Sequence, residues 1–305
     1  MNMRQRAVDA VKSITPVGAR RRLVRARLNV RRLTARFRLL PDFVILGGQR
    51  CGTSSLYKYL SRHPEIAPSL RKEIEYFTVD YARGEKWYRA HFPLRIRRLV
   101  HRAMGRKLLS FEATPDYLFD PRAPERLREL LPHARLIVLL REPVARAFSH
   151  YHHMARLGLE DLSFPEAIAA EKDRLAGQLR EMQDNPLSRV VPFRRFSYVT
   201  RGMYAEQLER WFEQFPREQF LILRASDFFS DPRTVLERIL DFVGAEPWAP
   251  TEFRNYSYTT TPSVNPDIPG PLAHLLAERF EDPNRRLEEL LGIDLAWGNA
   301  EKAPD

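Results

Sequence analysis

The residues best suited to chemistry lie in a glycine-rich turn near the start of the chain. An apolar run over residues 43–46 ends at Gly47 and Gly48, and the hydroxyl side chains of residues 53–55 open a segment of helical character. Backbone N–H groups at a helix N-terminus point at an anion, and the helix dipole adds favourable potential. Glycines let the backbone approach closely, and hydroxyls add hydrogen-bond donors. This order of strand, turn and helix predicts a phosphate site, with Arg50 as its cation.

The nearest general motif is the nucleotide P-loop, G-x-x-x-x-G-K-[ST]. Gly47 and Gly52 keep its spacing, but Thr53 stands where the lysine belongs. The strand expected over residues 135–140 also lacks the terminal aspartate that holds Mg²⁺ in an ATPase. The turn therefore favours a different phosphorylated ligand, and a P-loop kinase or nucleoside triphosphatase is the alternative interpretation.

A second candidate cluster follows the apolar run at residues 135–140, which is typical of a buried strand in a parallel sheet. Arg141 lies at the carboxyl end of this run, and Pro143 suits the first turn of a helix expected to continue over residues 144–153. Ser149 falls two turns into that helix. Open α/β sheets bind ligands at the carboxyl ends of their strands, so we expect Arg141 and Ser149 to face one crevice.

Both segments resemble those of sulfotransferases that use 3′-phosphoadenosine 5′-phosphosulfate (PAPS). Residues 50–56 fit the 5′-phosphosulfate loop, [KR]-x-G-T-[ST]-[ST]-L, at every position, and residues 141–151 match the 3′-phosphate motif, R-x-P-x-x-R-x-x-S-x-Y. The resemblance spans about residues 41–295 and implies transfer of a sulfuryl group from PAPS to a hydroxyl or an amine. It assigns the nucleotide contacts to Arg50, Cys51, Gly52, Thr53, Ser54, Ser55, Arg141 and Ser149.

The glycan-modifying branch of these sulfotransferases carries a segment similar to K-E-x-x-[FY]-F, which residues 72–77 match. The resemblance implies that Glu73 is the general base for the acceptor, with Lys72 beside it and Arg50 stabilising the leaving phosphate. Glu75 and His150 are the rival bases. The expected acceptor is a carbohydrate, a glycolipid or a small molecule. Further alternatives are a non-catalytic protein that binds the nucleotide and a membrane-associated binding protein built around the basic residues 1–40.

Composition narrows these interpretations. The chain has 305 residues, 44% of them apolar and 29% charged, which is typical of a globular protein with a substantial core. A single cysteine, Cys51, excludes an internal disulfide and favours a reducing compartment, and no apolar run is long enough to predict a transmembrane helix. His150, His152 and His153 do not share one helical face, so no metal site is expected.

The excess positive charge lies in an N-terminal arm. Residues 1–40 hold 12 of the 50 Lys and Arg residues and one of the 39 acidic residues, so the remainder is balanced with 38 of each. This balance argues against a nucleic-acid partner. The spacing of the arm's apolar residues indicates a basic amphipathic helix that either lies on an anionic membrane or packs on its own domain. These residues are Leu23, Ala26, Val30, Leu33, Phe37 and Leu40.

We therefore expect a basic arm over residues 1–40, one domain over 41–297 and a tail over 298–305. The domain should be α/β, with a P-loop-like, mostly parallel sheet flanked by helices. The expected location is cytoplasmic, peripheral on the inner membrane surface if the arm binds lipid. Residues 255–271 lack the basic loop that covers the 3′-phosphate in many relatives. Either Arg254 or Arg201 closes the site in its place, or the nucleotide is held less tightly.

The remaining pattern predicts further elements. Helices are expected over residues 55–62, 272–280 and 287–291, with another opening at Asp231 and Pro232. Strands are expected over residues 108–112 and 220–223. Residues 94–107 suggest a surface helix or loop, and residues 154–200 are polar and irregular in pattern.

Overall fold

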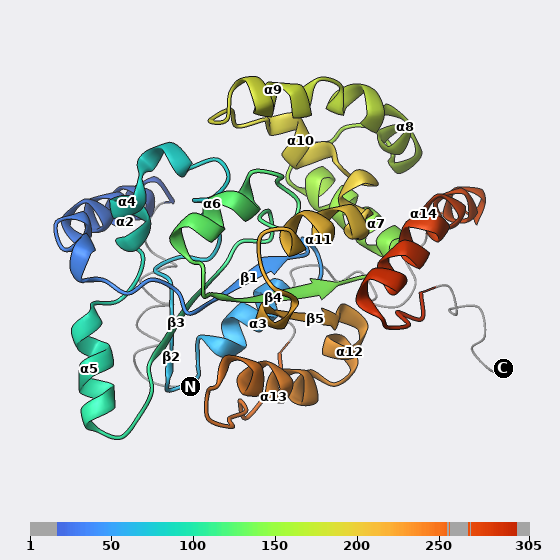
Figure 1. The fold of residues 1–305 in the computed structure, drawn as a ribbon. Helices are drawn as coiled ribbons and strands as arrows, with labels where there is room; N and C mark the ends of the chain where they lie inside the picture. The colour runs from blue at the N-terminus through green and yellow to red at the C-terminus, as the bar shows by residue number, and fades with distance from the viewer. Residues whose placement is uncertain (1–16, 255, 257–267, 269, 298–305) are drawn as a thin grey trace.

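The computed structural model describes residues 17–254, 256, 268 and 270–297. Its centre is a five-stranded sheet in the order β2-β3-β1-β4-β5, in which every neighbouring pair is parallel (Figure 1). The strands are β1 (Phe43–Gly47), β2 (Ile66–Pro68), β3 (Leu109–Ala113), β4 (Arg135–Leu140) and β5 (Phe220–Arg224). The prediction of an α/β fold with a parallel sheet is confirmed, whereas sequence reasoning missed the short strand β2.

Helices occupy most of the remaining described chain. The longer ones are α2 (Val17–Arg32), α3 (Thr53–Leu60), α4 (Glu85–Arg89), α5 (Arg95–Ala103), α6 (Ala123–Leu130), α7 (Pro143–Arg156), α8 (Phe164–Leu175), α9 (Gln178–Asp184), α10 (Val191–Phe196), α11 (Tyr204–Phe212), α12 (Ala225–Ser230), α13 (Pro232–Val243) and α14 (Gly270–Leu291). Short 3₁₀ turns are η1 (Ala35–Phe37), η2 (Tyr81–Arg83), η3 (Thr200–Gly202) and η4 (Arg217–Gln219).

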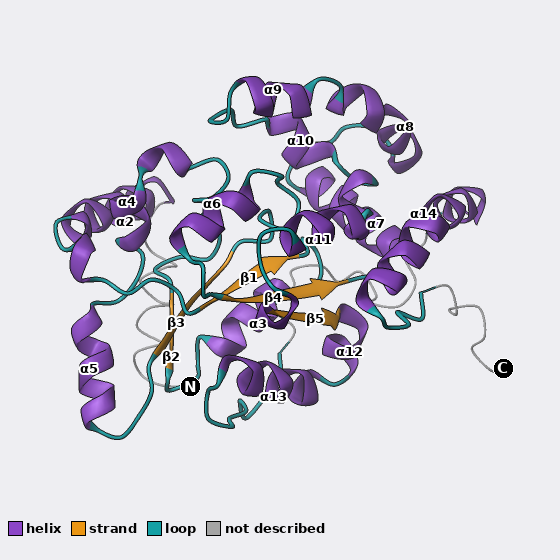
Figure 2. Cartoon of the chain, viewed as in Figure 1, coloured by secondary structure: helices purple, strands orange, loops and turns teal. Residues whose placement is uncertain are grey.

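Both faces of the sheet are covered, because alternate residues of a strand point to opposite sides. Val44 and Leu46 of β1 belong to one core cluster, with side chains from α4, α6 and α11. Phe43 and Ile45 belong to the other, with side chains from α3, α12 and α13. Figure 2 shows these two helical layers on either side of the strands.

Two stretches differ from their predictions. Residues 154–200 hold three helices, α8, α9 and α10, although prolines and polar residues obscure their periodicity. The two helices expected over residues 272–280 and 287–291 are one helix, α14, which runs through Pro283. Leu276, Phe280, Leu287 and Leu291 form its continuous buried stripe. This packing outweighs the hydrogen bond that a proline removes.

The predicted apolar face of the arm is wrong for the described residues. Helix α2 ends at Arg32, and a turn separates it from η1, so a single helical period does not continue to residue 40. Val30, Leu33 and Phe37 are exposed, with Leu33 at 83%, while the buried apolar residues are Leu28, Ala35 and Leu39. Residues 1–16, the side chain of Leu23 and the predicted tail at 298–305 lie outside the described part of the chain.

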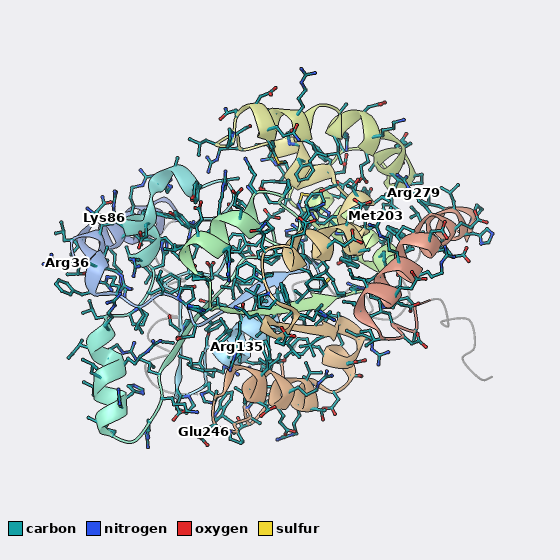
Figure 3. The ribbon with its side chains drawn as sticks, in the orientation of Figure 1. Arg36, Lys86, Arg135, Met203, Glu246 and Arg279 are labelled. Atoms are coloured by element: carbon teal, nitrogen blue, oxygen red, sulfur yellow. The ribbon has the colours of Figure 1, made fainter. Side chains whose placement is uncertain are left out.

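Two arginines fasten the end of the arm to the domain. Arg31 donates hydrogen bonds to the carbonyls of Ala90 (2.5 Å) and Phe92 (2.6 Å). Arg38 donates to the same Phe92 carbonyl at 2.9 Å. Burial and the charge of Arg38 lower the pKa of Arg31 to about 10, so it stays charged at neutral pH. Arg36 of η1 and Lys86 of α4 mark the edge of the molecule where the end of the arm meets α4 (Figure 3).

Candidate functional site

A cavity of about 590 Å³ opens at the carboxyl ends of the strands, where open α/β sheets bind ligands. Segments that follow all five strands contribute to its wall. They supply Arg50, Gly52, Thr53, Ser54 and Ser55 after β1, Lys72 and Glu73 after β2, Pro115 after β3, Arg141 after β4, and Phe228 and Phe229 after β5. The cavity thus gathers most of the residues that the sequence singled out.

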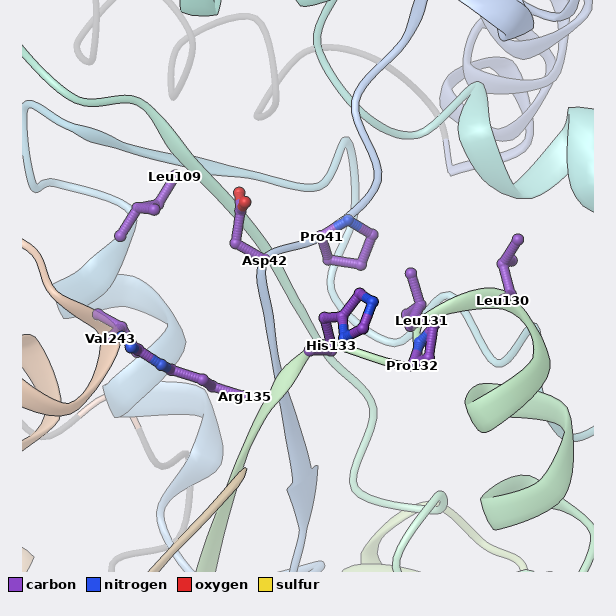
Figure 4. Close-up of a pocket in the computed structure, with 10 residues that line it drawn as sticks. Pro41, Asp42, Leu109, Leu130, Leu131, Pro132, His133, Arg135 and Val243 are labelled. Atoms are coloured by element: carbon purple, nitrogen blue, oxygen red, sulfur yellow. The ribbon is translucent and has the colours of Figure 1, made fainter. Parts of the chain in front are cut away.

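A smaller cavity, of about 420 Å³, lies at the opposite edge, where β1 and β4 begin (Figure 4). One arginine, Arg135, lines it, whereas five Lys and Arg residues line the larger cavity. Asp42 is also in its wall, but this carboxylate already pairs with Arg98 and accepts from the Ser110 amide at 2.7 Å. The larger cavity is therefore the candidate site for an anion.

The glycine-rich turn is shaped by contacts on both sides. The Gly48 amide donates to the Leu139 carbonyl at 2.6 Å, which anchors the turn on β4. Gly52 precedes α3 in a left-handed conformation (φ +94°), and a Cβ there would lie 2.9 Å from the ring of Phe229. The first amides of any helix lack intrahelical acceptors. The first residues of α3 line the cavity wall, so the amides at this end of the helix suit an anionic ligand.

The two motifs predicted to share a crevice are in direct contact. Arg50 donates from Nε to the Ser149 hydroxyl at 3.1 Å, although the two are 99 positions apart. Arg141 donates to the Arg50 carbonyl at 3.4 Å. The Tyr204 hydroxyl in turn donates to the Arg141 carbonyl at 3.0 Å and fixes the backbone there. Ser149 is buried beneath this pair, so it reaches the cavity through Arg50.

The site is strongly electropositive. Burial lowers the pKa of Arg50 to about 10, and the neighbouring charges of Arg141 and Arg156 add to the effect. Arg50 is still a cation at neutral pH, held beside other cations. An anionic ligand would relieve this repulsion and could accept charge-assisted hydrogen bonds, which are the strongest available to arginine.

Glu73 and Lys72 lie in the same cavity wall and form an ion pair. The Glu73 side chain is 48% exposed, so a substrate can reach its carboxylate. Its backbone amide donates to the Ala113 carbonyl at 2.9 Å, which ties the segment to the end of β3. This geometry suits a carboxylate that accepts a proton from a bound hydroxyl or amine.

The two rival bases lie elsewhere. Glu75 is not in the cavity wall, and its carboxylate accepts a hydrogen bond from Arg194 at 2.8 Å. His150 is fully buried against the ring of Tyr198, and burial together with Arg146 holds its pKa well below the usual range. Neither contacts the space that Glu73 faces.

Arg194 of α10 links the Glu73 segment to the helices of residues 158–196. It donates to Glu75 and, at 2.7 Å, to Asp116, which also accepts from Arg201 at 2.6 Å. Burial alone would raise the pKa of Asp116, but Arg201 and Arg194 lower it to about 2. Glu73 and Glu75 both adopt left-handed conformations, with φ of 59° and 61°. Such residues persist where surrounding contacts hold them.

Sequence reasoning missed several residues of the wall. His153 and Arg156 line the cavity from α7, and their spacing of four and seven from Ser149 could have indicated this. Aromatic residues form another part of the wall, and their separation in sequence gave no signal. They are Tyr57, Tyr59, Phe228, Phe229, Phe253 and Tyr256.

Three predicted residues take other roles or positions. Arg201 is buried and pairs with Asp116, so it does not close the site. Arg254 pairs with Glu252 at 2.8 Å, and most of residues 255–271 lies outside the described chain. Cys51 is buried beneath the turn, where burial raises the pKa of its thiol, so its contribution to the turn is its backbone. Among the described residues, no group of three His, Cys, Asp or Glu side chains is arranged to hold a metal ion.

Fold and cavity together define an α/β protein whose sheet edge carries a cationic turn and, in the same wall, an exposed carboxylate. A family model described as the sulfotransferase domain matches residues 40–261. The chain therefore belongs to the sulfotransferase domain family.

Several relatives agree with this assignment. The chain is 28% identical to the membrane-associated sulfotransferase kil1 of Dictyostelium discoideum, over 85% of this chain and 67% of that protein. It is 26% identical to the human heparan sulfate glucosamine 3-O-sulfotransferase 6, over 86% of this chain and 75% of that protein. It is 34% identical to the human bifunctional heparan sulfate N-deacetylase/N-sulfotransferase 3, over 68% of this chain but 23% of that protein.

A solved structure supports the fold. The crystal structure of a sulfotransferase from Alicyclobacillus acidocaldarius is 29% identical, with a TM-score of 0.59 over 85% of this chain and 99% of that one. In the described parts of the present chain, no helix is both long enough and apolar enough to span a membrane.

Proposed function

We propose that this chain transfers a sulfuryl group from PAPS to a hydroxyl or an amine of a carbohydrate acceptor. The observation that carries the proposal is the contact between Arg50 and Ser149, which joins the two anion-binding segments in one cavity beside Glu73. Heparan sulfate appears in the names of two of the relatives, which supports a carbohydrate over a small-molecule acceptor. A glycolipid would present the same hydroxyl chemistry.

The residues present fit PAPS. Gly52 lets the turn adopt a left-handed conformation close against Phe229, and the start of α3 with Arg50 would hold the 5′-phosphosulfate. Arg141 would contact the 3′-phosphate directly, and the buried Ser149 would act through its hydrogen bond to Arg50. PAPS would supply the sulfuryl group, together with a phosphate leaving group. No metal is invoked in this proposal.

The protein's own part in the reaction is positioning and charge stabilisation, as in phosphoryl transfer. Arg50 and the first amides of α3 stabilise the charge that grows on the leaving phosphate when its bond to sulfur breaks. Glu73 accepts the proton that the acceptor loses as its new bond to sulfur forms. Lys72 orients the Glu73 carboxylate through their ion pair.

Calorimetry with adenosine 3′,5′-bisphosphate tests the nucleotide site. We expect Arg50→Ala and Arg141→Ala each to weaken binding about ten- to a hundredfold, since a charge-assisted contact is worth about 1.5–3 kcal/mol. Arg285→Ala, on the exposed surface of α14, is the matched control and should bind normally. Unchanged affinity in both site variants would refute the assignment. Binding of Mg²⁺ and ATP instead would favour the kinase interpretation.

Turnover tests the reaction itself. Incubation with labelled PAPS and a panel of glycans, glycolipids and small metabolites should yield a product heavier by one sulfuryl group. Nucleotide binding without turnover on every acceptor would favour the non-catalytic alternative.

We also propose that the arm, residues 1–40, holds the chain at an anionic membrane surface on the cytoplasmic side. Exposed Leu33 and Phe37 and the surrounding arginines support this, as does the word "membrane-associated" in the name of one relative. Deleting the arm would remove the buried Leu39, so the test keeps the full chain. Leu33→Gln with Phe37→Gln should reduce sedimentation with anionic vesicles, and normal sedimentation would contradict the proposal.

A further inference from the structure

Helix α5 has its polar side toward the protein and its apolar side outward. Ile96, Leu99 and Val100, with Met104 directly after the helix, are each 50–60% exposed, and no residue of α5 is buried. At about 100° per residue these four side chains fall on one side of the helix. An ordinary surface helix has the reverse arrangement, with its apolar stripe against the core.

The inward side of α5 is held by polar contacts. Arg98 donates to the Leu108 carbonyl at 3.0 Å and pairs with Asp42, and His101 contacts the Lys107 carbonyl at 3.2 Å. Arg95 donates to the Arg38 carbonyl at 3.3 Å, next to the antiparallel bridge between Arg38 and Leu94. These contacts fix which side of the helix faces outward. In Figure 1, α5 lies at the edge of the molecule, apart from both helical layers.

Positive charge borders the apolar stripe. Residues 94–107 hold six Lys and Arg residues and no Asp or Glu. By helical position, Arg95 and Arg102 flank one side of the stripe and Arg97 the other. Long arginine side chains of this kind can place their charge among phosphate headgroups while apolar neighbours enter the boundary below. Although residues 41–305 are balanced in charge as a whole, the surface formed by residues 94–107 is strongly basic.

We propose that α5 is a membrane-docking helix whose outward apolar side inserts at the surface of an anionic lipid bilayer. This proposal concerns an element outside residues 1–40 and does not depend on the sulfuryl-transfer proposal. The membrane partner is favoured by charge complementarity.

A second copy of the chain fits this surface less well. Two such helices would bring their arginines together, and like charges at an interface oppose association. Two turns of helix also offer far less than the roughly 800 Å² per partner that a stable protein interface buries. An interfacial helix needs only a short apolar stripe with basic flanks.

The test uses the full chain and vesicles of phosphatidylcholine, with or without about 30% phosphatidylserine. We expect sedimentation with the anionic vesicles, weakened by salt. Ile96→Gln, Leu99→Gln and Val100→Gln together should lower the partition coefficient at least roughly tenfold, because glutamine keeps helix propensity but removes the apolar stripe. Arg97→Gln with Arg102→Gln should lower it by about fivefold per arginine.

The matched control replaces exposed apolar residues elsewhere, with Leu179→Gln, Leu187→Gln and Leu275→Gln. It should sediment like the unaltered chain. Circular dichroism and affinity for adenosine 3′,5′-bisphosphate should be unchanged in every variant, which separates a failure here from a failure of the proposed enzyme function. Arm variants measured in parallel separate α5 from residues 1–40.

A labelled variant reports the contact directly. Because Cys51 is buried, Leu99→Cys would place the one accessible thiol of the described chain on α5, where it can carry an environment-sensitive dye. We expect a blue shift when anionic vesicles are added. Equal partition of the triple variant and the control would overturn the proposal, as would an unchanged dye signal on sedimented protein. Loss of self-association in the triple variant, without vesicle binding by the unaltered chain, would assign the surface to a second copy instead.

Discussion

Glu73 combines access to the cavity with a cationic partner, Lys72, whereas Glu75 has a cationic partner but does not line the cavity. Glu73→Gln keeps the shape of the side chain and removes its basicity. We expect turnover to fall by about 10²–10⁴ while affinity for adenosine 3′,5′-bisphosphate is retained. Product formation with labelled PAPS and calorimetry on the same preparation are the two measurements. If Glu73→Gln keeps a near-normal kcat while Glu75→Gln or His150→Ala abolishes it, the base has been assigned to the wrong residue.

Gly52 is a second residue on which the shape of the turn depends, because its backbone is left-handed and the rings beside it leave no room for a side chain. In Gly52→Ala the new Cβ would lie 2.9 Å from Phe229, with φ at +94°. We expect binding of adenosine 3′,5′-bisphosphate to fall by tenfold or more, since the turn must shift away from the geometry that presents its amides.

Gly177→Ala separates the two causes of the effect expected in Gly52→Ala, the positive φ and the contact with Phe229. Gly177 has a similar positive φ of 75°, but a Cβ added there would meet nothing within 4 Å. The substitution should cost about 1 kcal/mol of stability and leave nucleotide binding intact. Equal loss of binding in both variants would show that backbone conformation anywhere in the chain, and not the crowded turn, governs affinity.

Among the elements, the short helix α10 supports the segment that carries Glu73. Arg194 reaches from it to Glu75 and Asp116 and holds the segment that carries Glu73. Arg194→Gln should reduce kcat roughly ten- to hundredfold, because small displacements of a catalytic group are costly. Affinity for adenosine 3′,5′-bisphosphate should not change. Steady-state kinetics and calorimetry measure the two effects.

Arg195→Gln, at the neighbouring exposed position of the same helix, is the control and should retain activity. The double variant Arg194→Gln with Glu75→Gln should recover part of kcat, since it removes the unpaired carboxylate. A parallel loss of nucleotide affinity in Arg194→Gln would mean that α10 supports the whole cavity and not the Glu73 segment alone.

The elements that could be predicted from sequence are those with strong local signals. The apolar runs of β1 and β4 and the residues following them carried enough local information to predict that the two segments meet at one cavity. The role of Arg194 could not be predicted, because its partners lie 119 and 78 positions away. Its helix also has only six residues, too few to show a helical period in the sequence. The single helical face predicted for the arm was wrong, because the helical period was extended through a turn that follows Arg32.

On the scale of the whole molecule, stability should depend on a buried carboxyl. Glu112 is fully buried and accepts hydrogen bonds from Tyr88 (2.5 Å) and Thr114 (2.8 Å). Burial raises its pKa from the usual 4.5 to about 7 despite these hydrogen bonds. Between these values the folded chain holds a proton that the unfolded chain has released. Its contribution to stability is therefore complete below the lower value and is lost as the pH rises to about 7.

Glu112→Gln should remove this part of the pH dependence. Urea unfolding between about pH 5 and pH 8 should show a free energy of unfolding that falls less steeply than in the unaltered chain, by up to about 1.4 kcal/mol per pH unit. Glu125→Gln, on the exposed side of α6, is the control and should follow the unaltered chain. A variant slope equal to that of the unaltered chain would show that Glu112 is ionised in the fold.

The ion pair between Arg194 and Glu75 also bears on how such enzymes can be recombined. The helices of residues 158–196 and the strand-end segment of residues 72–77 are separate stretches of sequence that are joined by the ion pair between Arg194 and Glu75. A chimera that takes one stretch from a relative and leaves the other in place would leave Arg194 or Glu75 without its ion-pair partner. Exchanging both stretches together would keep a matched pair. Replacing either stretch in this scaffold therefore requires replacing both, because Arg194 of the distant helices pairs with Glu75 of the strand-end segment.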